Sequence, residues 1–159
     1  MSGKKMLAAL ARDIPPRPRG SGYPEPFAAR VAGRQKRKLG DAFGLTNIGI
    51  NLTRLQPGAE TALLHRHTVA DEFIYVLAGT PTLVTDQGEM ELVPGMCAGF
   101  PARGLAHHLV NRSPEPVDIL EISDRLPGDG GEYPADDLKA EQDETGRWHF
   151  LHKDGTPYE

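Results

Sequence analysis

The sequence predicts an all-β fold, either a sandwich or a closed barrel of short strands. Between residues 46 and 123, seven or eight short segments are either continuously apolar or alternate between apolar and polar residues. Gly and Pro residues separate these segments, and the chain contains 18 Gly and 14 Pro among 159 residues. This punctuation is typical of many short strands joined by turns and disfavours long helices.

The first forty residues are predicted to form a basic arm. Residues 1–26 are rich in Pro, Gly and Arg, which favours an extended segment, and residues 27–38 fit a short helix or a strand. Residues 1–40 carry ten Lys/Arg and two Asp/Glu, whereas residues 41–159 carry eight and twenty. The basic run at residues 34–38 invites a nucleic-acid interpretation, but no aromatic residues interleave it. We therefore expect the arm to lie on acidic surface of its own chain or of a partner subunit.

The central strands can be placed one by one. Residues 46–55 begin with a clean alternation that puts Ile48, Ile50 and Leu52 on one face. The apolar run at residues 73–78 is typical of a strand buried on both faces, and Cys97 in its small apolar segment is expected to be a core thiol. The other predicted strands are residues 61–67, 82–85, 89–93, 96–100, 107–111 and 117–123, with a hairpin turn around Gly88.

The last part of the chain is predicted to be an acidic C-terminal extension that packs on the barrel through an apolar segment at residues 148–151. The domain prediction is accordingly an arm at residues 1–40, a barrel at residues 41–123 and the extension at residues 124–159. No apolar stretch reaches the roughly 20 residues that a membrane helix needs. The N-terminus lacks a signal-peptide cleavage pattern, and the lone cysteine cannot form an internal disulfide. We expect a cytoplasmic protein without a membrane partner.

A candidate metal site is formed by His65, His67, Glu72 and His107. On a strand, His65 and His67 point to the same face because side chains alternate with period two. Imidazoles combined with a carboxylate suit transition metals better than calcium or magnesium. The choice of carboxylate is open from periodicity alone. An unbroken strand would put Asp71 on the histidine face, whereas a bend at residues 68–70 would bring Glu72 there.

The spacing of these residues resembles the paired motifs of the cupin superfamily over about residues 45–123. The first motif comprises Gly58, His65-x-His67, Glu72 and Gly79; the second comprises Gly95, Pro101, Gly104, His107 and Asn111. Two departures, one extra residue before His65 and Pro-x-x-Gly in place of Pro-x-Gly, both lie in turns. The resemblance implies a jelly-roll barrel, that is, a double-stranded β-helix. It also implies one divalent transition metal (Zn, Mn, Fe or Ni) held by His65, His67, Glu72 and His107.

The resemblance leaves the function open among three classes, because the superfamily supports many reactions. These are a sugar or sugar-phosphate isomerase, a non-haem metal dioxygenase, and a non-catalytic small-ligand-binding or regulatory cupin. For an enzyme, the candidate catalytic residues are Asp71, Tyr75 and Arg103, as base, proton donor and anion anchor. We expect a small polar ligand or substrate, no cofactor besides the metal, a homodimer, and no nucleic-acid partner.

Overall fold

The chain folds into three antiparallel sheets, described by a computed structural model for residues 6–158. Two 3-10 turns, η1 (Ala11–Asp13) and η2 (Phe27–Val31), precede the first strand, and one short helix, α1 (Leu39–Ala42), follows it. The strands are β1 (Arg34–Lys38), β2 (Ile48–Leu55), β3 (Arg66–His67), β4 (Glu72–Ala78), β5 (Thr82–Thr85), β6 (Gly88–Glu91), β7 (Cys97–Phe100), β8 (His107–Val110), β9 (Val117–Asp124), β10 (Gly130–Tyr133), β11 (Leu138–Gln142) and β12 (Trp148–Leu151).

The largest sheet has the strand order β1-β2-β9-β4-β7. Its centre is the long pair β2–β9, which is in register from Ile48 opposite Asp124 to Leu55 opposite Val117. Strand β4 continues the sheet on the other side of β9, and β7 forms its edge. Strands distant in sequence are thus neighbours, as expected where strands cross between sheets.

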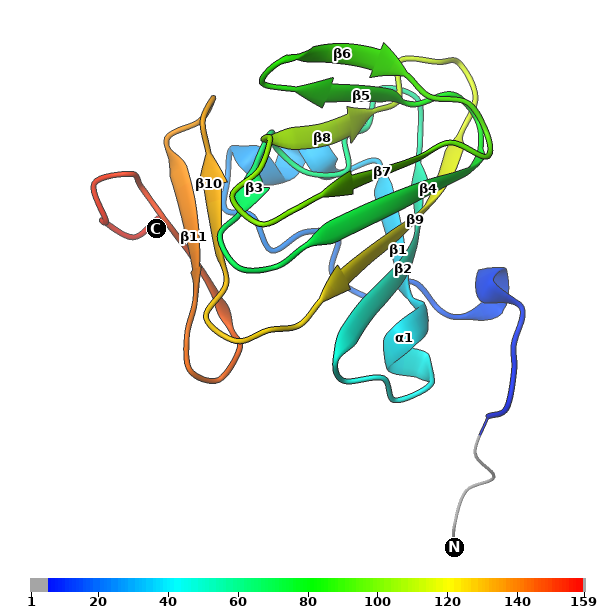
Figure 1. Ribbon diagram of the computed structural model, residues 1–159, viewed down its shortest axis with the longest axis horizontal. Coiled ribbons are helices and arrows are strands. Elements are labelled where there is room, and N and C mark those ends of the chain that lie inside the picture. Colours follow the sequence, from blue (N-terminus) through cyan, green and yellow to red (C-terminus); the bar gives the residue numbers. More distant parts are fainter. Residues whose placement is uncertain (1–5, 159) are drawn as a thin grey trace, which may run out of the picture.

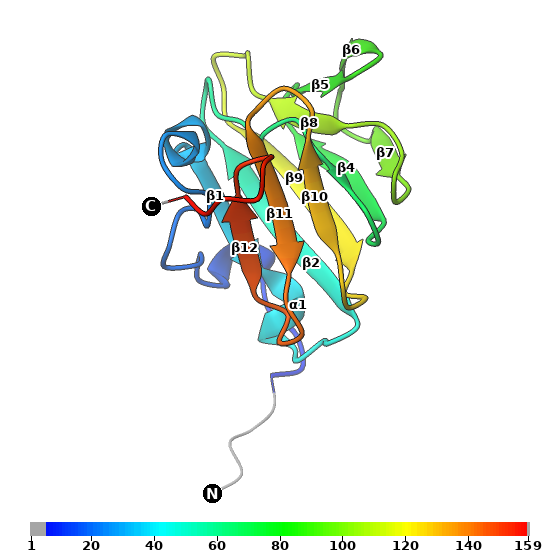
Figure 2. The ribbon, with the colours of Figure 1, turned by 90° about the vertical axis from the view of Figure 1, so that its left-hand side faces the viewer.

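The second sheet, β12-β11-β10-β3, lies opposite the first, and the hairpin β5–β6 with β8 forms a third sheet at one end. Figure 1 shows β10 and β11 on one side of the molecule and β9, β2 and β1 on the other. In Figure 2 the strands β10, β11 and β12 lie in front of the large sheet, so the two sheets form separate layers. This arrangement confirms the predicted all-β jelly-roll fold.

Two hydrophobic cores fill the space between the layers. The first contains Leu55, Ala59, Ile74, Val76, Leu92, Phe100, Leu109, Val117 and Ile119, drawn mainly from the central strands. The second contains Leu63, Tyr133, Leu138 and Ala140, against which Tyr23, Phe27, Trp148, Phe150 and Tyr158 pack. The second core therefore joins the N-terminal and C-terminal segments of the chain to the barrel.

Three local predictions are wrong or only partly right. Strand β4 is buried on one face, where Ile74 and Val76 lie, but Phe73 and Tyr75 on its other face are each 39% exposed. Cys97 is exposed because it lies on the edge strand β7. The predicted strand at residues 61–67 has regular pairing only at its end, in β3, preceded by bends. An apolar run alone does not show how many faces of a strand are covered.

The flanking segments contribute strands of their own. Residues 34–38, which the sequence analysis assigned to the arm, form β1 and pair with β2 over all five residues. Residues 124–158 contain β10, β11 and β12, and β10 pairs with β3. Within residues 6–158, no helix is long and apolar enough to cross a membrane.

Candidate metal centre

The histidines are brought together by pairing between two segments about forty residues apart in the chain. His65 and His107 form a bridge in which the His107 amide donates to the His65 carbonyl at 2.8 Å and the reverse bond measures 3.2 Å. His67 follows two residues after His65, so its side chain lies on the same face. Glu72 begins β4 and approaches from the large sheet.

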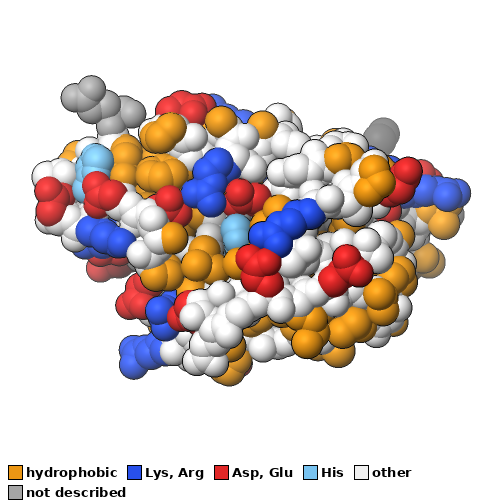
Figure 3. All heavy atoms as spheres, turned by 90° about the horizontal axis from the view of Figure 1, so that it is seen from above, with side chains coloured by type: hydrophobic (Ala, Val, Ile, Leu, Met, Phe, Trp, Pro, Cys, Tyr) orange, Lys and Arg blue, Asp and Glu red, His pale blue; other side chains and the backbone are white. Residues whose placement is uncertain are grey.

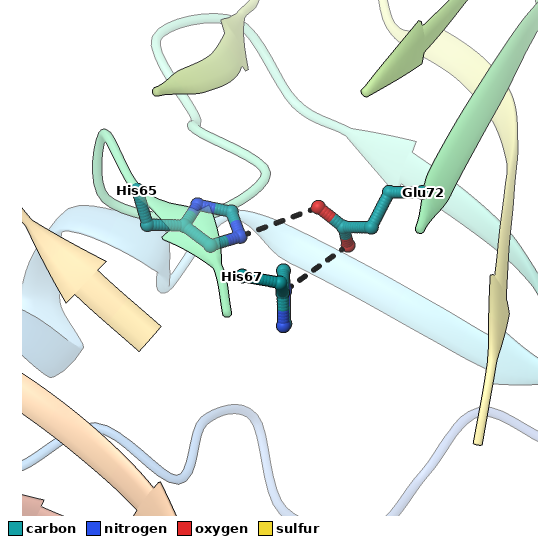
Figure 4. Close-up of side chains that lie close together, drawn as sticks. All are labelled: His65, His67 and Glu72. Carbon is teal, nitrogen blue, oxygen red and sulfur yellow. Dashed lines mark ion pairs between the residues drawn. The ribbon is translucent and has the colours of Figure 1, made fainter. Parts of the chain in front are cut away.

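All three imidazoles present their Nε2 atoms to the carboxylate of Glu72. The distances are 3.5 Å from His65 to Oε2, 3.4 Å from His67 to Oε1 and 2.9 Å from His107 to Oε2. Figure 4 shows the rings of His65 and His67 facing the two oxygens of Glu72. Ligand atoms of His65, His67 and Glu72 all lie within 4.8 Å of one another, a group compact enough to hold a metal ion.

The Nδ1 atoms are oriented by oxygen atoms behind the rings. His65 Nδ1 lies 2.8 Å from the Leu63 carbonyl, His67 Nδ1 lies 2.5 Å from Asp129 Oδ2, and His107 Nδ1 lies 3.3 Å from the Leu105 carbonyl. A carbonyl can only accept, so these contacts place a proton on Nδ1 of His65 and His107 and leave each Nε2 lone pair free. Backing of this kind fixes the tautomer and orientation of metal-binding histidines.

The Glu72 carboxylate provides a test of whether these residues fit a cation. Its Oε2 atom is buried and has no hydrogen-bond partner among the described residues, although His107 Nε2 lies close to it. Unprotonated Nε2 atoms would direct lone pairs at a negative oxygen, which is unfavourable without positive charge between them. A divalent transition metal would supply that charge, and nitrogen and carboxylate donors suit it.

The charges of the cluster also favour ionised groups. Burial lowers the pKa of His67, but the hydrogen bonds to Asp129 and then Glu72 outweigh it and raise that pKa to about 10. Burial raises the pKa of Glu72, but contacts with His107, His65 and His67 bring it well below its usual range. Glu72 is therefore a carboxylate at neutral pH, as metal ligation requires, whereas His67 holds a proton that a bound metal would displace.

The structure places Glu72, and not Asp71, against the histidines. Bends at residues 68–69 separate β3 from β4 and reset the alternation of side chains. Asp71 is exposed, and its Oδ1 accepts a hydrogen bond from the Ala102 amide at 2.8 Å. Asp71 therefore stabilises the loop at residues 101–104.

The cluster opens into a cavity of about 230 Å³. This is smaller than the roughly 300–1,000 Å³ of sites for drug-sized ligands, so the cavity suits a small molecule. Besides the four residues of the cluster, its lining includes the polar side chains of Tyr23, Arg34, Lys36, Thr61, Glu121 and Tyr133, and the aromatic rings of Trp148 and Phe150. Phe100 stacks on His107 with ring centroids 3.5 Å apart and fixes one wall.

The three candidate catalytic residues do not line this cavity. Asp71 supports a loop as described, and the Tyr75 side chain lies on the outer face of β4. Arg103 adopts φ 60°, its amide donates to the His67 carbonyl at 2.8 Å, and its Nε donates to the Thr68 carbonyl. The loop thus holds the backbone of β3 in place, and catalytic roles for these three residues remain sequence predictions.

Sequence reasoning missed the residues from the flanks that surround the metal cluster or line the cavity. Asp129 is 6% exposed and also accepts hydrogen bonds from the amides of Val69 and Ala70, so it holds both His67 and the bend before Glu72. Arg34 and Lys36 belong to the run that the sequence analysis assigned to an arm. Only the alternation along the run at residues 34–38 could have indicated that one of its faces points inward.

The surface of the molecule seen in Figure 3 carries charges of both signs. Basic and acidic side chains are interspersed there around a histidine near the centre of the view.

Comparison with known proteins identifies the family. The sequence profile of the cupin domain matches residues 51–123. A sugar phosphate isomerase of the cupin superfamily from Silicibacter pomeroyi is 42% identical, with 93% of this chain and 94% of that chain covered and a TM-score of 0.87. The chain is a member of the cupin superfamily.

Two further solved structures extend this comparison. A candidate sugar phosphate isomerase from Acidithiobacillus ferrooxidans is 32% identical, over 80% of this chain and 83% of that chain, with a TM-score of 0.72. The polyketide cyclase RemF from Streptomyces resistomycificus is 23% identical, over 78% of this chain and 83% of that chain, with a TM-score of 0.64, and shows the common fold. A search of curated proteins finds no match.

Proposed function

We propose that this cupin is a metal-dependent isomerase of small sugar phosphates, with the metal held by His65, His67, Glu72 and His107. The observation that carries the proposal is the convergence of three Nε2 atoms on one buried carboxylate at a cavity sized for a small molecule. Similarity to two proteins described as sugar phosphate isomerases supports the substrate class. A divalent cation in this position would act as a Lewis acid that polarises a substrate carbonyl.

The interconversion of an aldose and a ketose requires proton transfer between adjacent carbons. A proton leaves C2 and one is added at C1, while another moves from the C2 hydroxyl to the C1 oxygen, and no outside oxidant or reductant takes part. Glu72 belongs to the metal cluster, so Glu121 is the remaining carboxylate of the cavity. We assign the proton acceptor to Glu121.

The surroundings of Glu121 keep it ionised. Burial raises its pKa, but Lys36 Nζ at 3.0 Å and the Thr53 hydroxyl at 2.5 Å bring the pKa below its usual value. An ionised carboxylate is the form that accepts a proton. Burial raises the pKa of both Tyr23 and Tyr133, so their hydroxyl groups stay protonated, and the Tyr133 hydroxyl donates to that of Tyr23 at 3.4 Å in the cavity wall.

Solvent exchange tests this proposal directly. The protein loaded with manganese or zinc is incubated in D₂O with triose, pentose and hexose phosphates, and NMR follows both isomer formation and deuterium at C1 and C2. We expect metal-dependent isomerisation with deuterium incorporation for at least one substrate, and loss of both in Glu121→Gln. Glu141→Gln, which alters an exposed Glu–Lys pair, is the control. Neither isomerisation nor exchange with any substrate would reject the proposal.

We also propose that the protein forms a homodimer through the large sheet. Phe73, Tyr75 and Leu77 leave an exposed apolar row on β4, next to the edge strand β7. Such a row on a sheet beside an open edge favours association. Light scattering should give twice the chain mass, and Tyr75→Glu should give the single-chain mass.

A further inference from the structure

Arg34 is a buried cation without an ion-pair partner. Its side chain, on β1, is 9% exposed, and no carboxylate among residues 6–158 pairs with it. It donates instead to the backbone carbonyls of Thr61 and Gly20, and its Nε finds no hydrogen-bond partner in the described part of the chain. The negative charge that acts on Arg34 is that of buried Glu121, which Lys36 already engages at 3.0 Å. A buried guanidinium that shares its counter-charge in this way favours the binding of a further anion.

A second guanidinium lies close to Arg34. Arg17 donates to the same Gly20 carbonyl, and its amide donates to the Lys36 carbonyl at 2.9 Å. Its Nε is also buried and has no hydrogen-bond partner within residues 6–158. Burial first and Arg34 second lower the pKa of Arg17, as expected where two like charges approach. The fold therefore keeps positive charge concentrated behind this wall of the cavity.

Lys36 adds charge on the same face of β1. It follows Arg34 by two residues, so both side chains point toward the cavity, which both line. Lys36 pairs with Glu121 at 3.0 Å, and among residues 6–158 no other carboxylate forms an ion pair with Lys36 or Arg34. Arg34 and Lys36 against Glu121 leave one unit of positive charge at the cavity wall, before the charge of Arg17 is counted.

We infer that Arg34, with Lys36 beside it, is the binding site for the phosphate group of the substrate. The inference rests on the proposed function, because the metal cluster and this pair line the same cavity of about 230 Å³. One small molecule can therefore contact both groups. A guanidinium matches phosphate oxygens in charge and geometry, and Arg34 lines the cavity without a carboxylate paired directly to it among the described residues.

Fluorescence of Trp148 measures binding without requiring turnover. Trp148 is the only tryptophan of the chain and lines the cavity. Metal-loaded protein is titrated with fructose 6-phosphate, with fructose, and with gluconate as a carboxylate-bearing comparison. We expect fructose 6-phosphate to bind about 10- to 100-fold more tightly than fructose, as for a charge-assisted contact in a buried site. Gluconate binding as tightly as the phosphate would overturn the assignment to phosphate.

Substitutions at Arg34 and Lys36 test whether these side chains contact the phosphate group. Arg34→Gln should remove most of the preference for the phosphorylated sugar while fructose affinity and metal content stay unchanged. Arg54→Gln, which removes a half-exposed charge from the neighbouring strand β2, should leave the preference intact. If Arg34→Gln does not fold, Lys36→Met serves in its place and should weaken fructose 6-phosphate binding by about fivefold or more.

The outcomes test the proposed phosphate-binding site separately from the proposed isomerase activity. A preference for phosphate that survives both cavity variants overturns the site, even if isomerisation is observed. A preference lost in Arg34→Gln supports the site, even if no sugar phosphate is turned over. Equal affinity of the wild-type protein for fructose and fructose 6-phosphate overturns the site outright.

Discussion

The central region of the chain and its flanks contribute to the cavity in different ways. The central region, residues 51–123, provides the four residues of the candidate metal centre on strands and turns with strongly patterned sequence. The flanks, residues 6–50 and 124–158, provide the groups around that centre: Arg34, Lys36, Tyr23, Asp129, Tyr133 and Trp148. The comparison teaches that the candidate metal ligands all lie in the region that the cupin profile matches, whereas most of the basic and aromatic side chains around them come from the flanks.

The largest expected effect is on the stability of the second core, which the C-terminal flank helps to form. Leu138 on β11 is fully buried among residues of the C-terminal flank. If the flank is an integral layer, Leu138→Ala should lower the free energy of unfolding by about 2–5 kcal/mol, as Leu109→Ala should in the first core. Denaturant unfolding of both variants checks this. A Leu138→Ala variant with wild-type stability would show that the flank is only an attached surface layer.

A smaller effect is expected where a flank residue holds a residue of the central region. Asp129→Asn keeps the size of the side chain but removes the charge behind His67. Loss of such a backing group typically weakens metal binding by about 10- to 100-fold. Asp137→Asn is the control, because Asp137 contacts His152 at 2.7 Å on the exposed surface. Isothermal titration with zinc should distinguish the two variants, and equal affinities would contradict a role for the flank in the centre.

The pH dependence of the protein's stability tests the same contact between His67 and Asp129. In the metal-free protein the pKa of His67 is raised from 6.5 to about 10, so the folded state holds this proton more tightly than the unfolded chain. Its stabilising contribution is fully present below pH 6.5 and is lost as pH rises through 10. Metal must displace protons from the imidazoles, so the stabilisation by added metal should rise with pH.

Melting temperatures measured across pH, with and without zinc, check whether these two contributions to stability change in opposite directions. His67→Gln should flatten the metal-free profile between pH 6.5 and 10, whereas His152→Gln, on the surface, should not. Metal-free and metal-loaded proteins that respond to pH in the same direction would contradict the proposed ligation by His67.

The features that could be predicted from the sequence are those that depend on residues close to one another along the chain. Strand alternation and turn residues are local, so most central strands and the all-β class could be predicted. Glu72 was selected over Asp71 by its spacing to Gly79 in the cupin motif, and the bends at residues 68–69 place it against the histidines. The exposed face of β4 could not be predicted, because an apolar run does not reveal what covers it.

Contacts that span the chain were beyond sequence reasoning. Asp129 lies 62 residues from His67, and nothing in the acidic composition around it distinguishes it from a surface carboxylate. Arg34 lies in a basic run that resembles a solvated arm, yet pairing of β1 with β2 turns alternate residues inward. The catalytic candidates Asp71, Tyr75 and Arg103 were chosen as a base, a proton donor and an anion anchor in or beside the motifs, and none of the three lines the cavity.

The central claim is that three imidazoles and Glu72 hold one metal ion, and a comparison of two adjacent carboxylates tests it most directly. Zinc binding is measured by isothermal titration, with elemental analysis of the same samples, for the wild-type protein, Glu72→Gln and Asp71→Asn. We predict about one metal per wild-type chain, a loss of affinity of about tenfold or more in Glu72→Gln, and wild-type affinity in Asp71→Asn. A wild-type protein that binds no zinc, or loss of affinity in Asp71→Asn alone, would contradict the account.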